Sequence, residues 1–300
     1  MLGIASQLQL VELCDMQVNG MAAEAMATAQ IEGEVLHQQL VRASAARRLG
    51  LLQAVAVKKN TTKPTTKPAR KNFKRDQRAP AREEATLDVL QAAVSQWQQP
   101  LTQAQLCSWH AMLFPTGYSG ITVIPVGAYR THAESMQIVM PQIGKEDVVH
   151  YVAPPSKDVP AHMKKLITWF NQSQGQMDGL ARAAIAHLWL EAIHPFEDGN
   201  GRIDRALSDL ALAQDAQSNQ RLFSLSHQLM AQRNAYYDQL QAATGKGSLN
   251  VTAWVQWFAQ RMQAACEHSV QQMDVALGKT RYWAQVQTRH PTSLPANAKC

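Results

Sequence analysis

One stretch of this chain has apolar side chains on almost every face of a helix. It is LARAAIAHLWLEAI at residues 180–193, and a polar segment that begins at His194 follows it directly. A helix that is hydrophobic all round has to be covered by neighbours on every side. The chain must therefore wrap other elements around this helix. A composition of 46% hydrophobic and 17% charged residues provides the apolar material for such a core.

Apolar residues at helical spacing dominate the rest of the chain. This spacing predicts further helices over 1–50, 85–97, 101–113, 159–171, 202–214, 225–243 and 252–275. Residues 121–140 differ, because β-branched residues around Pro125 and again near 136–140 favour a small β-hairpin. We therefore expect an all-α fold with one small hairpin.

The net charge of +6 comes from one segment. Residues 58–82 hold ten Lys or Arg and one Asp, so the remaining chain has 19 basic against 22 acidic residues. The segment is rich in Lys, Thr and Pro and has no apolar periodicity, which predicts a disordered linker or insertion. A tether for nucleic acid or an acidic membrane is the alternative, but basic runs of this kind are more often solvated spacers. We expect no nucleic-acid partner.

The four cysteines are widely spaced and form no metal-binding pattern. They are Cys14, Cys107, Cys266 and Cys300. Scattered free thiols fit a reducing compartment. No basic residue precedes Arg42, so a secretory signal is not expected, and no run of 18 apolar residues predicts a membrane span. We expect a cytoplasmic protein without a membrane partner.

The segment after the apolar helix combines several kinds of chemistry. Pro195 keeps His194 from continuing the helix, so the imidazole is expected at the helix end, facing a loop. The glycine-rich turn 199–201 opens the next helix, where backbone N–H groups bind anions. Arg202 and Arg205 lie three residues apart on the first turn of that helix and can reach the same anion.

Asp198, on the same loop, can hold a magnesium ion that bridges phosphate oxygens. Each of these features alone has an ordinary explanation. A lone histidine is more often a hydrogen-bonded core residue, a Gly-Asn-Gly segment is more often only a turn, and two arginines are more often surface charges. Their coincidence within residues 194–205 favours a site for nucleotidyl transfer.

This segment resembles the motif of the Fic family, His-x-Phe-x-Asp/Glu-Gly-Asn-Gly-Arg-x-x-Arg. All eight fixed positions are met, by His194, Phe196, Asp198, Gly199, Asn200, Gly201, Arg202 and Arg205. The intact Gly-Asn-Gly differs from the Doc-type subgroup, which transfers phosphate. The similarity extends over roughly residues 20–285 outside the basic segment, and residues 127–130 and 136–139 look like the family's hairpin flap beside the site.

The resemblance implies the helical Fic (Fido) core and a protein adenylyltransferase, which uses ATP and Mg²⁺ to move AMP onto a Ser, Thr or Tyr hydroxyl of a protein. His194 would be the general base and Asp198 the magnesium ligand. The residues that would hold the nucleotide are Gly199, Asn200, Gly201, Arg202 and Arg205, with the arginines on the β- and γ-phosphates respectively. Tyr236 or Tyr237 would flank the adenine, although core packing is an equal alternative for a tyrosine pair on a helix.

A second similarity lies near the start of the chain. Residues 28–33, Thr-Ala-Gln-Ile-Glu-Gly, resemble the family's inhibitory pattern Ser/Thr-x-x-x-Glu-Gly/Asn. The resemblance implies that Glu32 pairs with Arg205 and so competes with the γ-phosphate. The alternative is an ordinary exposed helix glutamate before a C-capping Gly33.

These observations predict four segments: an N-terminal helical segment with the inhibitory helix (1–57), a basic linker (58–82), a Fic catalytic core (83–285) and a frayed tail (286–300). The function they favour is an autoinhibited adenylyltransferase. A hydrolase that removes AMP at the same site and a non-catalytic nucleotide-binding regulatory or toxin–antitoxin-like module are the alternatives. The expected partner is a protein with a hydroxyl side chain; self-modification and a homodimer remain open.

Overall fold

The structure of the chain is a computed structural model that describes residues 10–50, 79–134, 136–140, 148–245 and 250–289. Its helices are α2 (Leu10–Ile31), α3 (Gln38–Arg48), α4 (Ala79–Ser95), α5 (Gln103–Leu113), α6 (Val159–Gln172), α7 (Gly179–Ile193), α8 (Asn200–Ala216), α9 (Leu225–Ala231), α10 (Arg233–Thr244) and α11 (Thr252–Arg289). A 3₁₀ turn, Ser156–Asp158, precedes α6. The strands are β1 (Tyr118–Ser119), β2 (Thr122–Val123), β3 (Gln137–Met140) and β4 (Val148–Val152). The predicted all-α fold with a small hairpin is confirmed.

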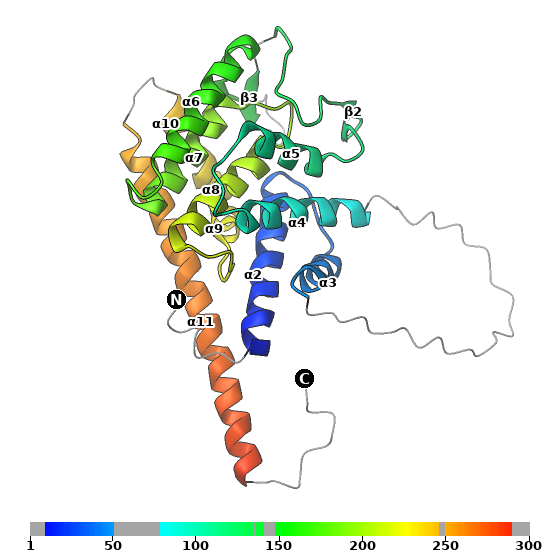
Figure 1. The fold of residues 1–300 in the computed structure, drawn as a ribbon, viewed down its shortest axis with the longest axis vertical. Helices are drawn as coiled ribbons and strands as arrows, with labels where there is room; N and C mark the ends of the chain where they lie inside the picture. The colour runs from blue at the N-terminus through cyan, green and yellow to red at the C-terminus, as the bar shows by residue number, and fades with distance from the viewer. Residues whose placement is uncertain (1–9, 51–78, 135, 141–147, 246–249, 290–300) are drawn as a thin grey trace, which may run out of the picture.

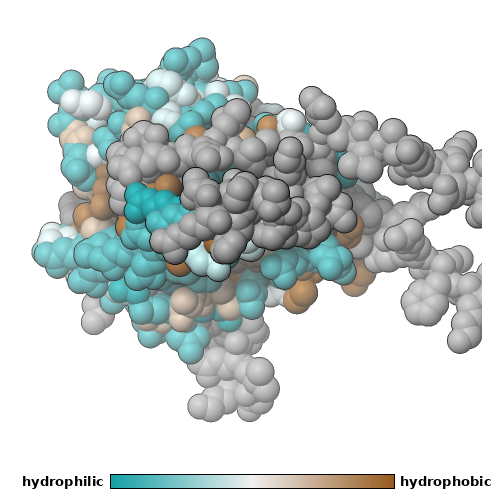
Figure 2. Space-filling view, turned by 90° about the horizontal axis from the view of Figure 1, so that it is seen from below, coloured by the Kyte–Doolittle hydropathy of each residue, from teal (hydrophilic) through white to brown (hydrophobic). Residues whose placement is uncertain are grey.

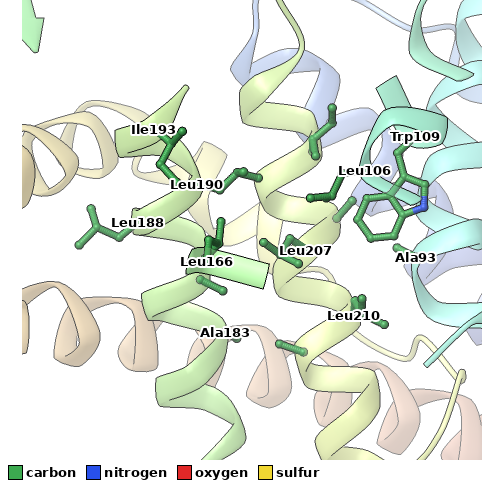
Figure 3. Close-up of a cluster of buried hydrophobic side chains, with 14 of the residues drawn as sticks. Ala93, Leu106, Trp109, Leu166, Ala183, Leu188, Leu190, Ile193, Leu207 and Leu210 are labelled. Atoms are coloured by element: carbon green, nitrogen blue, oxygen red, sulfur yellow. The ribbon is translucent and has the colours of Figure 1, made fainter. Parts of the chain in front are cut away.

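Helix α7 lies at the centre, as its all-round apolar sequence predicts. Its main partner is α8, and α6 and α11 pack on its other sides (Figure 1). In Figure 3, Leu190 lies between α7 and α8, whereas Leu188 points away from α8 and Leu210 points away from α7; Leu190 and Leu207 are fully buried. This packing fixes the end of α7 relative to the start of α8, which are the two ends of the candidate site.

The N-terminal helix α2 packs into the body of the fold, against α9, α3 and α4. A buried carboxylate anchors it: Glu24 accepts hydrogen bonds from the Ser224 hydroxyl (2.8 Å) and the Ser226 backbone N–H (3.1 Å), and it lies 3.8 Å from Arg221. Because a buried carboxylate without partners is costly, this cluster holds α2 in one orientation. The C-terminal end of α2 therefore meets α8.

The hairpin differs from the one that the sequence predicts over 121–140. Strand β3 begins at Gln137 and pairs antiparallel with β4, which lies beyond the predicted hairpin. A second, two-residue hairpin joins β1 to β2. Tyr129 and Arg130 are in no strand; both are buried. Their side chains support the loop after α7, which is why this part of the chain is not an exposed flap.

Several helix ends also differ from the prediction. The expected helix over 225–243 breaks at Gln232, and the last helix continues past 275 to Arg289, into the predicted tail. Helix α4 begins at Ala79, four residues inside the predicted linker; residues 51–78 of that linker and 290–300 of the tail lie outside the described residues. Gly33 has φ +79° and ends α2 in the left-handed conformation that favours glycine.

The coloured part of the face in Figure 2 shows no extended apolar band. In the view of Figure 2, hydrophilic residues cover most of the coloured surface and hydrophobic residues are scattered among them. Within the described part of the chain, no helix has both the length and the apolar character needed to cross a membrane.

Candidate active site

The end of α7 turns His194 out of the helix. Asp178 caps the start of α7 by accepting the Ala181 N–H (2.9 Å), and His194 caps its end with φ +48° and ψ +63°. The His194 N–H still donates to the Leu190 carbonyl (2.9 Å), and Pro195 cannot extend the helix. The left-handed conformation costs about 1–3 kcal/mol and has to be held by the surroundings.

Arg130 holds the backbone at this point. Its Nε donates to the His194 carbonyl (2.8 Å), and its two terminal nitrogens donate to the Ser156 hydroxyl (2.8 Å) and the Pro154 carbonyl (2.5 Å). The Arg130 N–H donates to the Pro195 carbonyl (2.9 Å). A buried guanidinium that donates to several acceptors makes strong, directional contacts, so Arg130 fixes the orientation of the His194 segment.

Phe196 and Asn200 fix the loop that joins α7 to α8. The buried Phe196 ring stacks on His110, with ring centroids 4.4 Å apart and planes 9° apart. The Asn200 side chain accepts the Phe196 N–H (2.9 Å) and donates to the Phe196 carbonyl (2.8 Å). The Asn200 amide is therefore used within the loop, and only its backbone N–H is left for an anion.

Asp198 lies at the mouth of the site with 43% of its side chain exposed. Its Oδ1 accepts the Gly199 N–H (2.5 Å), and its Oδ2 accepts the Ser119 hydroxyl from the β1–β2 hairpin. Arg202 is 3.9 Å away. Both carboxylate oxygens point into polar surroundings, as a cation ligand requires.

The two arginines of α8 are engaged by the N-terminal segment. Arg205, with 2% of its surface exposed, donates to the Thr28 hydroxyl (2.6 Å), the Thr28 carbonyl (3.2 Å) and Glu32 Oε1 (2.6 Å). Burial disfavours the charged guanidinium, but the neighbouring acidic groups, Glu32 foremost, together raise the pKa of Arg205. Arg202 donates instead to Glu34 Oε1 (3.1 Å). The structure thus brings Glu32 and Arg205 together, and it adds a second pair that the sequence analysis missed.

The Glu32 carboxylate also covers the N-terminus of α8. A side chain on Gly201 would collide with Glu32 Oε1, so the glycine permits this close approach. The start of α8 presents free N–H groups and the positive end of the helix dipole. Glu32 therefore occupies the position that suits an anion.

A cavity of about 260 Å³ lies between these groups. Its lining residues are Glu32, Glu191, His194, Asp198, Gly199, Asn200, Gly201, Arg205, Tyr236, Tyr237 and Leu240. The predicted site residues thus meet in one place, with the exception of Arg202, which does not line the cavity. Its volume is below the ~300–1,000 Å³ of typical small-molecule sites, which fits a site that Glu32 partly fills.

The two tyrosines have different surroundings. Tyr236 is buried and its hydroxyl lies 2.8 Å from His187 Nε2, so much of its side chain belongs to the core. Tyr237 is half-buried; its hydroxyl is 3.4 Å from the Ile31 carbonyl and Arg233 lies over its ring. Both rings still touch the cavity.

Sequence reasoning missed Glu34 and Glu191. Glu191 lies one helical turn before His194 on α7 and reaches the cavity, but a single acid in an apolar helix has no motif. Glu34 follows Gly33 in a loop, and its contact with Arg202 joins residues 168 positions apart in the chain. The one signal available in the sequence for Glu34 was its charge, which is opposite to that of the motif arginines. This charge does not show which arginine Glu34 contacts.

Gly199→Ala is expected to destabilise the protein by about 1–3 kcal/mol. Gly199 has φ +81°, and a Cβ atom would come within 2.8 Å of the Phe114 ring. Chemical denaturation measures the effect. Gly278→Ala is the matched control, because a Cβ atom added there on α11 would have nothing within 4 Å and the helix gains propensity. Equal stability of the two variants would contradict the strained turn.

Two regions of the chain match known family models. Residues 100–212 match the model of the Fic/DOC family. The matched residues include the whole loop between α7 and α8. Residues 1–51 match a second model, described as a domain of unknown function (DUF4172). The Glu32–Arg205 ion pair joins the two matched regions.

Short stretches are similar to curated relatives. The chain is 44% identical over 55 residues to the protein adenylyltransferase fic-1 of Caenorhabditis elegans, covering 18% of this chain and 11% of the relative. It is 33% identical over 79 residues to a probable protein adenylyltransferase of Aquifex aeolicus, covering 25% of this chain and 24% of the relative. The matched stretches are thus a quarter or less of each relative's length.

Solved structures share the fold over much more of the chain. A Fic domain containing signaling protein from Bacteroides thetaiotaomicron matches with a TM-score of 0.64 at 17% identity, covering 90% of this chain and 94% of that one. Fic-1 of C. elegans (residues 134–508) matches with a TM-score of 0.60 at 22% identity, covering 91% of this chain and 69% of that one. Residues 100–212 thus match the Fic/DOC family, and the chain has the all-α Fic fold with a small β-hairpin flap.

Proposed function

We propose that the chain is a protein adenylyltransferase that moves AMP from ATP to a Ser, Thr or Tyr hydroxyl of a protein. The observation that carries this proposal is one cavity lined by His194, by the N-terminus of α8 and by Arg205. It combines a base, backbone N–H groups for phosphate and a guanidinium. The adenylyltransferase names of the relatives support the same reaction class.

His194 is the general base of the proposed reaction. The acceptor hydroxyl oxygen bonds to the α-phosphorus, the bond from that phosphorus to the bridging oxygen breaks, and pyrophosphate leaves. His194 takes the hydroxyl proton. The N–H groups at the start of α8 and the charges of Arg202 and Arg205 stabilise the phosphate oxygens.

Asp198 fits a magnesium ion that it would share with the phosphates of ATP. In the described part of the chain, no group of three or more His, Cys, Asp or Glu side chains could hold a metal ion together. Mg²⁺ commonly needs only one or two carboxylates besides phosphate oxygens and water. When bound, the ion neutralises phosphate charge. The contacts from Ser119 and Gly199 orient the Asp198 carboxylate for this role.

Two acidic residues after α2 keep the proposed enzyme inhibited. Glu32 occupies Arg205, and Glu34 occupies Arg202. A triphosphate has to displace these carboxylates or bind with its terminal phosphates misplaced. In this proposal, residues 1–57 form the inhibitory segment and 83–285 the catalytic core. Glu32 has the larger effect, because its guanidinium partner is more deeply buried.

A hydrolase that removes AMP from a modified protein is the second candidate. The observation in its favour is that the Glu32 carboxylate lines the same cavity as His194, where it can orient a water molecule. A non-catalytic nucleotide-binding module is the third. It gives no reason for His194 to line the cavity beside the phosphate-binding groups.

ATP labelled at a chosen phosphate tests the reaction class. We expect the α-label to become attached to protein in the presence of Mg²⁺ and the γ-label to be released as pyrophosphate. Attachment of the γ-label would mean phosphate transfer. Binding of ATP without attachment of either label, in the presence of candidate protein substrates and with Glu32 replaced, would favour the regulatory module.

A further inference from the structure

Two carboxyl groups lie buried together behind His194. Glu191 comes from α7 and Asp204 from α8, and only Glu191 reaches the cavity. Asp204 has no exposed surface, and 14% of the Glu191 side chain is exposed. The two carboxyl groups are close enough for each to shift the pKa of the other. Two carboxylates in contact cannot both keep their charge in such a place, so one of them holds a proton.

The proton belongs to Asp204, because Asp204 is the more deeply buried of the two acids and Glu191 faces the His194 ring. Among the described residues neither Asp204 oxygen has a hydrogen-bond donor within reach. His187 Nε2, at 3.6 Å, is the nearest ring nitrogen. Burial and the Glu191 charge raise the pKa of Asp204 well above its ordinary value. Asp204 is therefore a neutral acid that donates to Glu191.

His187 cannot donate a hydrogen bond to the Asp204 carboxyl group. Ser208 donates its only hydroxyl hydrogen to the Asp204 backbone carbonyl (3.0 Å), so His187 Nδ1, at 3.1 Å, must donate to Ser208 Oγ. His187 Nε2 then accepts from the Tyr236 hydroxyl at 2.8 Å. Burial and the nearby Arg205 lower the pKa of His187 to about 3, which agrees with this neutral ring.

Glu191, in turn, faces the His194 ring. Its Oε1 lies 3.5 Å from His194 Nδ1, and this nitrogen is buried with no other partner among the described residues. The separation exceeds that of an ideal N–H···O bond, but contacts of this kind tighten when substrate binds. Burial alone would raise the pKa of Glu191, but a protonated His194 ring and the Asp204 carboxyl group lower it below its ordinary value. Glu191 is thus an anion.

We propose that Glu191 is the positioning residue for His194 and that Asp204, as a neutral hydrogen-bond donor, holds Glu191 in place. The role rests on the proposed adenylyl transfer. Glu191 accepts from His194 Nδ1–H, which leaves the Nε2 lone pair free for the acceptor hydroxyl. When His194 takes the hydroxyl proton, the adjacent anion stabilises the imidazolium that forms.

The proposed positioning of His194 by Glu191 can be tested without enzyme turnover, by determining which ring nitrogen of His194 carries the hydrogen. This tautomer is called the ring form below. We expect ¹⁵N resonances of the full-length protein, at a pH well above the ordinary pKa of histidine, to place the hydrogen of His194 on Nδ1. Glu191→Met removes the acceptor at similar length, and both ring forms should then be populated. A His194 ring with its hydrogen on Nε2 in the unaltered protein would overturn the proposal, whatever the variants do.

Transfer rates give the second test, measured in a Glu32→Gly background so that inhibition is absent. Glu191→Met should lower kcat on the order of 10- to 100-fold with little change in the KM for ATP. Asp204→Asn should keep most of the rate and the Nδ1–H form, because an amide still donates to Glu191. If Asp204→Asn lowered kcat as much as Glu191→Met does, this would contradict a neutral Asp204.

Asp209→Asn is the matched control for a buried acid on the same helix. Asp209 is ion-paired with Arg221 (2.5 Å), and among the described residues it forms no ion pair with His194. The substitution should reduce thermal stability without moving the His194 ring form. A change in ring form as large as that of Glu191→Met would show that general loosening of the core, not positioning, controls the ring.

Discussion

Replacing Glu32 with glycine is expected to raise AMP transfer on the order of 10- to 100-fold. Glu32 Oε1 lies 2.6 Å from Arg205 and directly over Gly201, so its removal frees both a guanidinium and the N-terminus of α8 for the phosphates. A tenfold rate change corresponds to about 1.4 kcal/mol, which a partly buried arginine–carboxylate pair can supply. The measurement is attachment of α-labelled AMP to protein over time.

Glu34→Gln is the matched variant for this experiment. It removes the same charge two residues further along, but its partner Arg202 does not line the cavity. We therefore expect a smaller rise than for Glu32→Gly. Equal labelling rates for the unaltered protein and Glu32→Gly would leave Glu32 as an ordinary helix-end residue. Slower removal of AMP from a modified protein, without faster transfer, would favour the hydrolase.

Replacing His194 with alanine in the Glu32→Gly background should reduce transfer by about 10²- to 10⁴-fold, the usual contribution of a general base. Release of inhibition cannot restore a group that accepts the hydroxyl proton. Binding of ATP should be nearly unchanged, because the phosphate-binding groups stay in place. Calorimetric titration with ATP, beside the labelling assay, separates the two effects.

His227→Ala is the control for a histidine substitution as such. His227 is exposed on α9, where its ring stacks on His268 away from the cavity. In the Glu32→Gly background, the His227→Ala variant should transfer AMP at the same rate as the Glu32→Gly protein. Full transfer by the His194→Ala double variant would mean that another group accepts the proton, and His194 would lose its proposed role.

The local order of the site follows from the sequence because it depends on neighbours in the chain. The apolar run in α7 requires burial, Pro195 ends it, and Gly199 permits the tight turn into α8. The C-capping role of Gly33 is also local, and it was part of the alternative explanation of residues 28–33. The resemblance of residues 194–205 to the Fic motif led to the proposed function, and the Glu32–Arg205 contact implied by the similarity of residues 28–33 is present.

Contacts between distant segments were decided only by the tertiary structure. By resemblance, residues 127–130 were expected in a hairpin flap beside the site, yet Arg130 is in no strand, is buried and donates to the His194 carbonyl. Hydrophobic patterning cannot anticipate this, because a buried arginine is stable only where several backbone acceptors converge on it. The pairing of β3 with β4 was missed for a related reason, since it depends on long-range register.

The polar surroundings of His194 also depend on the fold. Glu191, Asp204 and Glu34 are ordinary single acids in the sequence, and their roles arise from the packing of α7 against α8 and of α2 against both the core and α9. Sequence patterns thus determined the helices, the turn and the motif, because short-range sterics and burial set these. Tertiary packing decided which charged residues form ion pairs. The free energy of an ion pair depends on the burial of its two groups and on the distance between them, and the local sequence sets neither.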